Sequence, residues 1–504
     1  MSTMISSGLR SSRPLPALTL EAALPQQVSE PPSRDGLLEK LARALDGAGI
    51  RYCQWKGHWS AHRWSRGYGD VDLLIDHAAV NEFRNIAGEL GFKLAHPGGE
   101  RQLPGVEHYF GLDPEVPRLL HLHVHYRLLL GEYWKCVYRL PIERQILEQS
   151  VPGQPFRVPS PTHTFLIFVL RMMLRQVGRP LLSARARWLG GIQVPLASLQ
   201  AASDATALGK LLEQHLPQID IPFFEACVRS LDGRSSWADR ILLPWQLHLK
   251  LRAYVRRPPA AALVSALLER VLPASIADYL TDACMRPSGG GVVVALISGD
   301  GSGKSTCARE LHQWLAPELS VMRAHLGNPS RSLLTLVAGA ALKLEQAVYS
   351  QVGRSPAGVS RLELLRHVCT ARDRYRLYQK AWRFAAAGGI AVCERYPVRP
   401  GYVHVAPVIP ELISAQSGGL AGLLRKLEAS YYGGILPPDL VFVLSIDPEL
   451  AVQRKPEEPA DYVRARSRVI RETDWAATGA VIVDASRPLP EVLQQLKTAI
   501  WSTL

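Results

Sequence analysis

A short glycine-rich segment carries residues whose types and spacing suit the binding of phosphate. It runs from Ser298 to Thr306 and reads Ser-Gly-Asp-Gly-Ser-Gly-Lys-Ser-Thr. Glycines accept positive φ angles, so successive backbone N–H groups can turn inward around phosphate oxygens. The Lys304 ammonium can reach the terminal phosphates of a nucleotide, and the Ser305 hydroxyl can ligate Mg²⁺. The residues that we predict to hold ATP and Mg²⁺ are Gly299, Gly301, Ser302, Gly303, Lys304, Ser305 and Thr306.

The flanking segments must place this loop at the end of a strand and the start of a helix. Val292–Ile297 is an uninterrupted apolar run, which is typical of a buried strand in a parallel sheet. Thr306–Leu315 has an amphipathic helical pattern, and the N-terminus of such a helix directs its positive dipole end at a bound anion. This order of strand, loop and helix predicts a P-loop, with Ser298 in place of the usual first glycine.

Later motifs, in the same order along the chain, resemble the thymidylate kinase family. They are Asp300 inside the loop, Ala371–Tyr375 on a predicted helix, the triplet Glu394-Arg395-Tyr396 after a strand, and the strand and turn of Pro438–Glu449. The resemblance spans residues 289–504. It implies a P-loop kinase domain, in which a parallel sheet is flanked by helices.

The resemblance also implies roles for single residues. Asp300 would face the acceptor substrate, and Arg374 and Arg395 would grip the phosphate of that acceptor. Glu394 would be catalytic, orienting Mg²⁺ or its water ligands. Where the family has a base-binding segment after its third motif, this chain reads Pro397-Val-Arg-Pro-Gly401. The acceptor therefore stays open between a nucleotide, a sugar and another small phosphorylated molecule.

A lid helix is expected to supply one further cation. The loop carries Ser302 rather than a basic residue, so the arginine that neutralises charge during phosphoryl transfer must come from elsewhere. Arg464, Arg468 and Arg471 are spaced i, i+4, i+7 and share one face of a predicted helix. They are the candidates, with Arg464 and Arg468 as the catalytic prediction; a solvated basic face is the alternative interpretation.

A second group with metal-binding chemistry lies near the N-terminus. Asp70 and Asp72 alternate along a predicted strand, so both carboxylates face one side and can hold the divalent ions of a nucleotidyl transfer. Lys56 and Gly57 precede them by about a dozen residues. This pattern resembles the polymerase-β-type nucleotidyltransferases, in which the earlier segment binds phosphate.

The third carboxylate of that family has no counterpart here. The segment His121-Leu-His-Val-His125 occupies its place, and His123 stands where an aspartate is expected. One interpretation is a domain that binds nucleotides without robust transferase activity. The other is that His121, His123 and His125 form a different site, for Zn²⁺ or another borderline metal.

Length and pattern predict an α/β protein of about three domains. We expect a disordered tail over 1–34, a nucleotidyltransferase-like domain over 35–160, a helical connector over 161–288 and the P-loop kinase domain over 289–504. No motif in the helical connector indicates a catalytic or binding function, so packing or homodimerisation is its expected role. No apolar stretch reaches the roughly 18 residues needed to span a bilayer.

The amino-acid composition indicates which kinds of binding partner the chain favours. The chain has 58 basic and 45 acidic residues, a formal net charge of +13, which suits anionic ligands and also fits a solvated basic surface. The seven cysteines are widely spaced without a Cys-x-x-Cys pair, so neither a zinc knuckle nor a disulfide framework is indicated, and a reducing compartment fits best. We therefore expect a cytoplasmic protein acting on a small phosphorylated molecule rather than on nucleic acid.

These observations favour an ATP-dependent phosphotransferase of the nucleoside-monophosphate-kinase type. It would transfer the γ-phosphoryl group of ATP to a nucleoside monophosphate or to another small phosphorylated or sugar acceptor. Two alternatives remain open. The first is a nucleotidyltransferase with a regulatory P-loop domain, and the second is a non-catalytic ATP-binding switch protein.

Overall fold

The computed structural model describes residues 36–98, 103–132, 136–176, 193, 195–256, 284–351, 358–398, 406–414 and 419–504. The expected tail, 1–34, lies outside these ranges, as do residues 257–283 of the predicted connector and residues 399–401 after the third kinase motif. The described chain is mixed α/β, with one mixed sheet, one parallel sheet and a two-stranded ribbon. The predicted α/β class is thus confirmed.

The N-terminal sheet contains six strands in the order β1-β2-β5-β4-β3-β8. They are β1 (Tyr52–Lys56), β2 (Asp70–Ile75), β3 (Lys93–Pro97), β4 (Val106–Gly111), β5 (Leu120–His125) and β8 (Met285–Pro287). Only the β2–β5 pair is parallel. On one face, alternate residues such as Val71 and Leu73 pack against α1 (Leu37–Gly47) and α3 (Val80–Glu89). The opposite face therefore carries Asp70 and Asp72.

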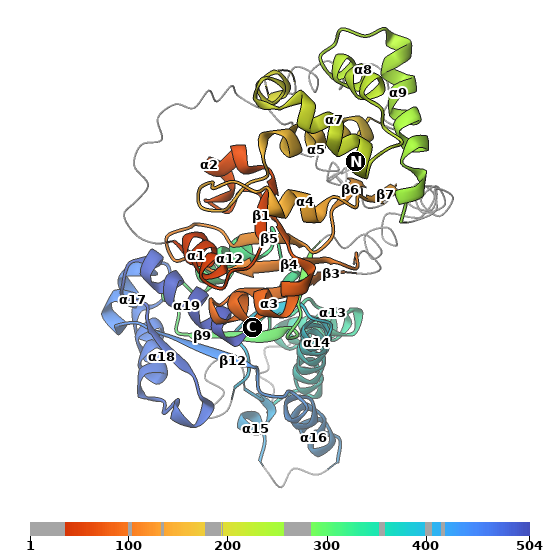
Figure 1. Ribbon diagram of the computed structural model, residues 1–504. Coiled ribbons are helices and arrows are strands. Elements are labelled where there is room, and N and C mark those ends of the chain that lie inside the picture. Colours follow the sequence, from red (N-terminus) through yellow and green to blue (C-terminus); the bar gives the residue numbers. More distant parts are fainter. Residues whose placement is uncertain are drawn as a thin grey trace.

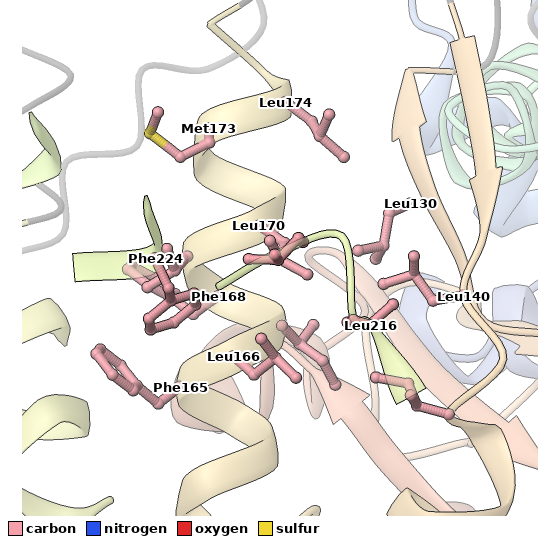
Figure 2. Packing of buried hydrophobic residues seen from close by; sticks show 14 of the residues in the cluster. Leu130, Leu140, Phe165, Leu166, Phe168, Leu170, Met173, Leu174, Leu216 and Phe224 are labelled. Atoms are coloured by element: carbon pink, nitrogen blue, oxygen red, sulfur yellow. The ribbon is translucent and has the colours of Figure 1, made fainter. Parts of the chain in front are cut away.

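A helical group follows the sheet in sequence. It consists of α5 (Pro161–Leu174), α7 (Ala205–His215), α8 (Ile221–Leu231) and α9 (Trp237–Lys250). The elements before it in the chain include the ribbon of β6 (Leu129–Glu132) and β7 (Cys136–Arg139) and the short helices α2 (Ala61–Trp64) and α4 (Glu143–Glu148). Almost every residue of α5 is buried, so this helix is the core of the group. Figure 2 shows Phe165 and Phe168 beside Phe224 of α8, with Leu130 and Leu140 approaching α5 from the other side.

The C-terminal sheet has five parallel strands in the order β10-β11-β9-β12-β13. They are β9 (Val292–Ser298), β10 (Val321–His325), β11 (Ile390–Glu394), β12 (Leu440–Ser445) and β13 (Val481–Asp484). The helices are α12 (Lys304–Leu315), α13 (Leu333–Gln351), α14 (Arg361–Ala386), α15 (Ile409–Leu412), α16 (Gly419–Gly433), α17 (Pro448–Arg454), α18 (Ala460–Glu472) and α19 (Leu489–Thr503). Helices α12 and α19 cover one face and α14 covers the other. Because both faces are covered, β9 is apolar along its length.

The N-terminal sheet lies between the helical group and the C-terminal sheet, as Figure 1 shows. The stretch predicted as a helical connector ends in β8, which extends the N-terminal sheet by pairing with β3. Ala95 and Phe110 of that sheet share a buried cluster with Val294 of β9. The Trp501 indole of α19 donates a hydrogen bond to the Gly91 carbonyl at 3.0 Å. The two sheets are thus joined by shared core packing.

Two expectations from composition bear on the described residues. Among the described cysteines, Cys53, Cys227, Cys307, Cys369 and Cys393 are free thiols. Within the described ranges, no helix combines the length and the apolar character that crossing a membrane requires.

Candidate phosphate and metal sites

The glycine-rich loop joins the carboxyl end of β9 to α12. Strand β9 ends at Ser298, and α12 begins at Lys304, two residues before the predicted start of the helix. Gly301 and Gly303 have φ angles of 77° and 80°, a conformation that residues with a Cβ rarely adopt. Since β9 is the middle strand of a parallel sheet, the loop opens at the edge where open α/β sheets bind ligands.

Lys304 is a nearly buried cation at the base of this loop. Its side chain is 6% exposed, and its ammonium donates a hydrogen bond to the Ser298 hydroxyl at 3.1 Å. Burial, together with the charge of Arg395, lowers the pKa of Lys304 to about 8. An ammonium has three N–H donors, so it can pair with an anion in the same place. An anion there would relieve the cost of burying the charge.

Oxygen atoms suited to a hard cation meet beside the loop. The Ser305 hydroxyl donates to one oxygen of Glu394 at 2.6 Å, and Arg323 donates to the other at 3.0 Å. Burial alone would raise the pKa of Glu394, but these two hydrogen bonds outweigh it and lower that pKa. A hydroxyl and an ionised carboxylate are ligands that Mg²⁺ accepts. The donor set therefore fits Mg²⁺, which Ser305 and Glu394 could hold together.

Asp300 is clamped by two arginines from different elements. Its carboxylate accepts a hydrogen bond from Arg395, after β11, at 2.7 Å and one from Arg466 of α18, also at 2.7 Å. Burial acts to raise the pKa of Asp300, but the charges of Arg395 and Arg466 lower it. Arg395 has a φ angle of 53°, uncommon for a residue with a side chain. Its Nε is buried and has no hydrogen-bond partner among the described residues.

The predicted lid arginines lie on α18, but another arginine reaches the loop. Arg464 pairs with Glu449 and Asp461, and Arg471 pairs with Asp447, so both contact α17 or their own helix. The arginine of α18 that contacts Asp300 is Arg466, which the i, i+4, i+7 spacing did not select. The periodicity identified a helix face shared by Arg464, Arg468 and Arg471, yet the loop lies toward a different face.

Arg374 lies deeper than the proposed role in gripping a phosphate suggests. Its guanidinium donates to the Leu326 carbonyl at 2.7 Å and to the Tyr432 hydroxyl. Burial lowers the pKa of Arg374. These bonds hold the side chain between the end of β10 and helix α16.

The N-terminal carboxylates share a sheet face with the histidine row. In the parallel register, Asp70 lies opposite His121 and Asp72 opposite His123. The Asp72 Oδ1 atom lies 2.7 Å from the Lys56 ammonium and 2.9 Å from Nδ1 of His123. Burial would raise the pKa of Asp72, but Lys56 and His123 outweigh it and lower that pKa. Asp72 is therefore an anion at neutral pH.

Asp70 belongs to a neighbouring set. Its Oδ1 lies 2.9 Å from Nδ1 of His121, and that nitrogen lies 3.9 Å from Glu318, in the turn after α12. His121 Nε2 in turn lies 3.1 Å from Nδ1 of His108 on β4. Burial raises the pKa of Glu318. The C-terminal unit thus places a carboxylate against the N-terminal row.

The predicted three-histidine set is wrong in one member. The side chains whose ligand atoms come together are Asp72, His123 and His125, all within 4.8 Å of one another. His121 is directed to Asp70 instead. Residues on alternate strand positions are about 6–7 Å apart, so three imidazoles along one strand cannot all converge. A carboxylate from the adjacent strand takes the third place.

Sequence patterns did not identify several residues that contact these sites. Among them are Arg466, Arg323, Glu318 and His108. The alternation of β10 offered a signal for Arg323, because parallel β10 and β11 bring it next to Glu394 at the sheet edge. Glu318 lay in no motif and could not be found from spacing.

Comparisons with known proteins found one family match and several similar proteins. Residues 18–214 match a family described as an uncharacterised nucleotidyltransferase, so the N-terminal part contains a nucleotidyltransferase-like domain. The uncharacterized ATP-binding protein YghR of Escherichia coli is 24% identical over 224 residues, which cover 41% of this chain and 86% of YghR. YghS of the same species, also described as an uncharacterized ATP-binding protein, is 25% identical over 226 residues, 42% of this chain and 93% of YghS.

A narrower likeness concerns kinases. A probable thymidylate kinase of Archaeoglobus fulgidus is 36% identical over 92 residues, which cover 17% of this chain and 44% of that protein. The chain thus resembles less than half of that kinase.

Proposed function

We propose that the chain is an ATP-dependent phosphotransferase whose P-loop kinase unit, residues 289–504, transfers the γ-phosphoryl group of ATP to a small phosphorylated acceptor. One observation carries the proposal: Lys304, the Ser305–Glu394 pair and the arginine clamp on Asp300 converge around one glycine-rich loop. Similarity to proteins described as ATP-binding supports ATP as the donor.

Each part of the loop region has a task in phosphoryl transfer. The loop backbone would cradle the phosphates of ATP, and Lys304 would neutralise the terminal ones. Mg²⁺ held by Ser305 and Glu394 would screen the charge between the phosphates. Arg466 is the lid arginine best placed to neutralise charge during transfer, since its side chain already reaches the loop. Such a site acts mainly by positioning and electrostatics.

The acceptor side rests on Arg395. Its unpartnered Nε and its bond to Asp300 show a guanidinium only partly used by the protein. A planar guanidinium can bind two oxygens of a phosphate at once, which a lysine cannot reproduce. We therefore assign the acceptor phosphate to Arg395. A nucleoside monophosphate and a phosphorylated sugar both offer such a group.

A nucleotidyltransferase is the second candidate, favoured by the N-terminal family match and by Asp70 and Asp72 on one sheet face. Full-length protein should be incubated with ATP and a panel of nucleoside monophosphates and phosphorylated sugars. A kinase releases ADP, and a nucleotidyltransferase releases pyrophosphate. An ATP-binding switch binds ATP without converting it into either product during repeated turnover. The released product therefore separates the three functions.

Two variants assign the activity to a site. Lys304→Ala should lower ADP formation by about a hundredfold or more, as expected for loss of a preorganised charge in the transition state. Asp72→Asn is the matched control and should leave ADP formation within a few-fold. Pyrophosphate release that survives Lys304→Ala but not Asp72→Asn would instead establish the second candidate.

Arg395→Lys tests the acceptor side. We expect the KM for the acceptor to rise roughly ten- to hundredfold, the size of a lost charge-assisted hydrogen bond, while the KM for ATP stays nearly unchanged. Steady-state kinetics with each substrate varied in turn measure both constants. An equal rise in the two KM values would place Arg395 on ATP.

A further inference from the structure

Two buried imidazoles and a buried carboxylate converge outside the kinase site. Asp72, His123 and His125 are 7%, 4% and 3% exposed, and one ligand atom from each lies within 4.8 Å of the others. Asp72 comes from β2, and both histidines come from the adjacent parallel strand β5. Three ligands fixed by neighbouring strands form a preorganised set.

His125 gives an independent sign of a missing partner. Neither of its ring nitrogens has a hydrogen-bond partner among the residues that the structure describes. Buried polar atoms are paired in the great majority of cases, so an imidazole with both nitrogens unsatisfied requires an explanation. His125 Nε2 lies 3.9 Å from Asp72 Oδ1, too far for a hydrogen bond. Two ligands of a single ion, each at about 2.0–2.2 Å from it, are separated by a distance of this order.

The packing around the histidines brings their rings together. The ring centroids of His123 and His125 are 4.4 Å apart, closer than the roughly 6–7 Å spacing of alternate residues along a strand. Trp55 packs edge-on against His125 at 5.0 Å. His108 stacks on His123 at 4.6 Å. The neighbouring rings therefore hold both imidazoles toward Asp72.

We propose that Asp72, His123 and His125 bind a borderline divalent metal ion of the Zn²⁺ class. Imidazole nitrogens suit Zn²⁺ and related transition ions, whereas Mg²⁺ prefers a shell of oxygen ligands. The metal site is separate from the proposed kinase site and does not depend on it. It replaces the two-carboxylate Mg²⁺ arrangement that the Asp70–Asp72 pair alone would predict.

Lys56 stands as the competitor for this site. Its ammonium lies 2.7 Å from Asp72 Oδ1 and compensates the carboxylate charge without a metal. A bound ion must displace the ammonium or share Asp72 with it, and like charges repel at that distance. Removing the Lys56 charge should therefore strengthen metal binding. A merely structural cluster would instead lose the close ion pair between Lys56 and Asp72.

The test uses the full-length chain stripped of metal by a chelator and titrated with Zn²⁺ by calorimetry. We expect a site of about one ion per chain that excess Mg²⁺ does not displace. His125→Gln should weaken Zn²⁺ binding at least about tenfold, and Lys56→Met should tighten it. His163→Gln is the matched control: His163 is equally buried and also has an unpartnered Nε2, but it lies on α5 in the helical group.

Several outcomes would overturn the proposal. These are no Zn²⁺ binding, binding that Mg²⁺ displaces, an unchanged affinity in His125→Gln, or an equal loss in His163→Gln. Should His125→Gln fail to fold, Co²⁺ binding to the wild-type chain decides. Bound Co²⁺ should then give an intense visible absorption, which Zn²⁺ abolishes and which Lys56→Met strengthens. Absence of this absorption refutes the site.

Discussion

The positively charged side chain of Lys304 lies close to other cationic side chains. Arg395 and Arg466 both lie near enough to disfavour the ammonium, and burial disfavours it more strongly, so its pKa falls to about 8. In an unfolded chain a lysine titrates near 10.4. The protonation of Lys304 therefore depends on whether an anion is bound and on the pH. Bound phosphate would raise the pKa of Lys304 again by favouring the charged form.

The lowered pKa of Lys304 predicts a pH dependence of ATP binding. In the ligand-free protein Lys304 loses its charge as the pH rises through about 8, and binding must then restore the proton. Affinity should therefore fall with rising pH, to about a tenth of its neutral value near pH 9. Calorimetry of ATP binding from about pH 7 to 9 measures it. Lys304→Met corrects for the titration of ATP itself, and equal pH profiles in both proteins would contradict the prediction.

At the scale of elements, the loop glycines also serve helix packing. A Cβ on Gly301 would lie 2.5 Å from the Ala451 carbonyl of α17, and one on Gly299 would lie 2.9 Å from Ser467 Oγ of α18. Helices α17 and α18 thus sit directly against the loop. Gly303 differs: a Cβ there meets no atom within 4 Å. Two functions of glycine, positive φ and close approach, are therefore separable along one loop.

Gly301→Ala and Gly303→Ala form a matched pair. Both place alanine at a positive φ, which costs roughly 1–2 kcal/mol. Only Gly301→Ala adds the clash with α17, so we expect it to lower the free energy of unfolding by a further 1–3 kcal/mol or so. Urea denaturation of the two variants measures the difference. Equal losses of stability in the two variants would mean that α17 shifts away from the loop and accommodates the added methyl group.

How far the sequence could predict these elements depended on the strength of each pattern. The apolar run of β9 predicted the strand to within one residue, and the glycine spacing after it predicted the loop, although α12 begins two residues earlier than expected. The direction of α18 was not predictable, because helical periodicity relates residues to one another and not to a neighbouring loop. For that reason Arg466 was missed. The His121–His125 strand was predicted, but its partner Asp72 depended on which strands are adjacent.

At the scale of the whole molecule, the two sheets share a core that sequence patterns did not reveal. Strand β8 has three residues, Met285–Pro287, too few to show an alternation. It nevertheless pairs with β3, and the side chain of its middle residue, Arg286, donates to the Ala387 carbonyl at the end of α14. Trp501 packs near Trp314 of α12, with ring centroids 6.4 Å apart, and bonds to Gly91. Contacts this far apart in sequence leave no local signal.

The shared core predicts that the two sheets lose stability together when Trp501 is truncated. Trp501 is 7% exposed, and its indole hydrogen bond to Gly91 ties α19 to the N-terminal sheet. Trp501→Ala should lower the free energy of unfolding by about 3–5 kcal/mol, the usual cost of deleting a large buried ring. Trp501→Phe keeps most of the volume and loses the hydrogen bond, so it should cost about 1 kcal/mol plus a small packing term.

Hydrogen exchange can locate these losses within the chain. Peptides from β3 and β4 report on the N-terminal sheet, and peptides from α12 and β9 report on the C-terminal one. Because Ala95, Phe110 and Val294 belong to one buried cluster with Trp501, protection should fall in both groups of peptides in Trp501→Ala. Trp55→Ala, in the separate cluster around α5, is the control and should affect the N-terminal sheet and the helical group first. Loss of protection confined to α19 and its own sheet in Trp501→Ala would show that the two sheets unfold independently.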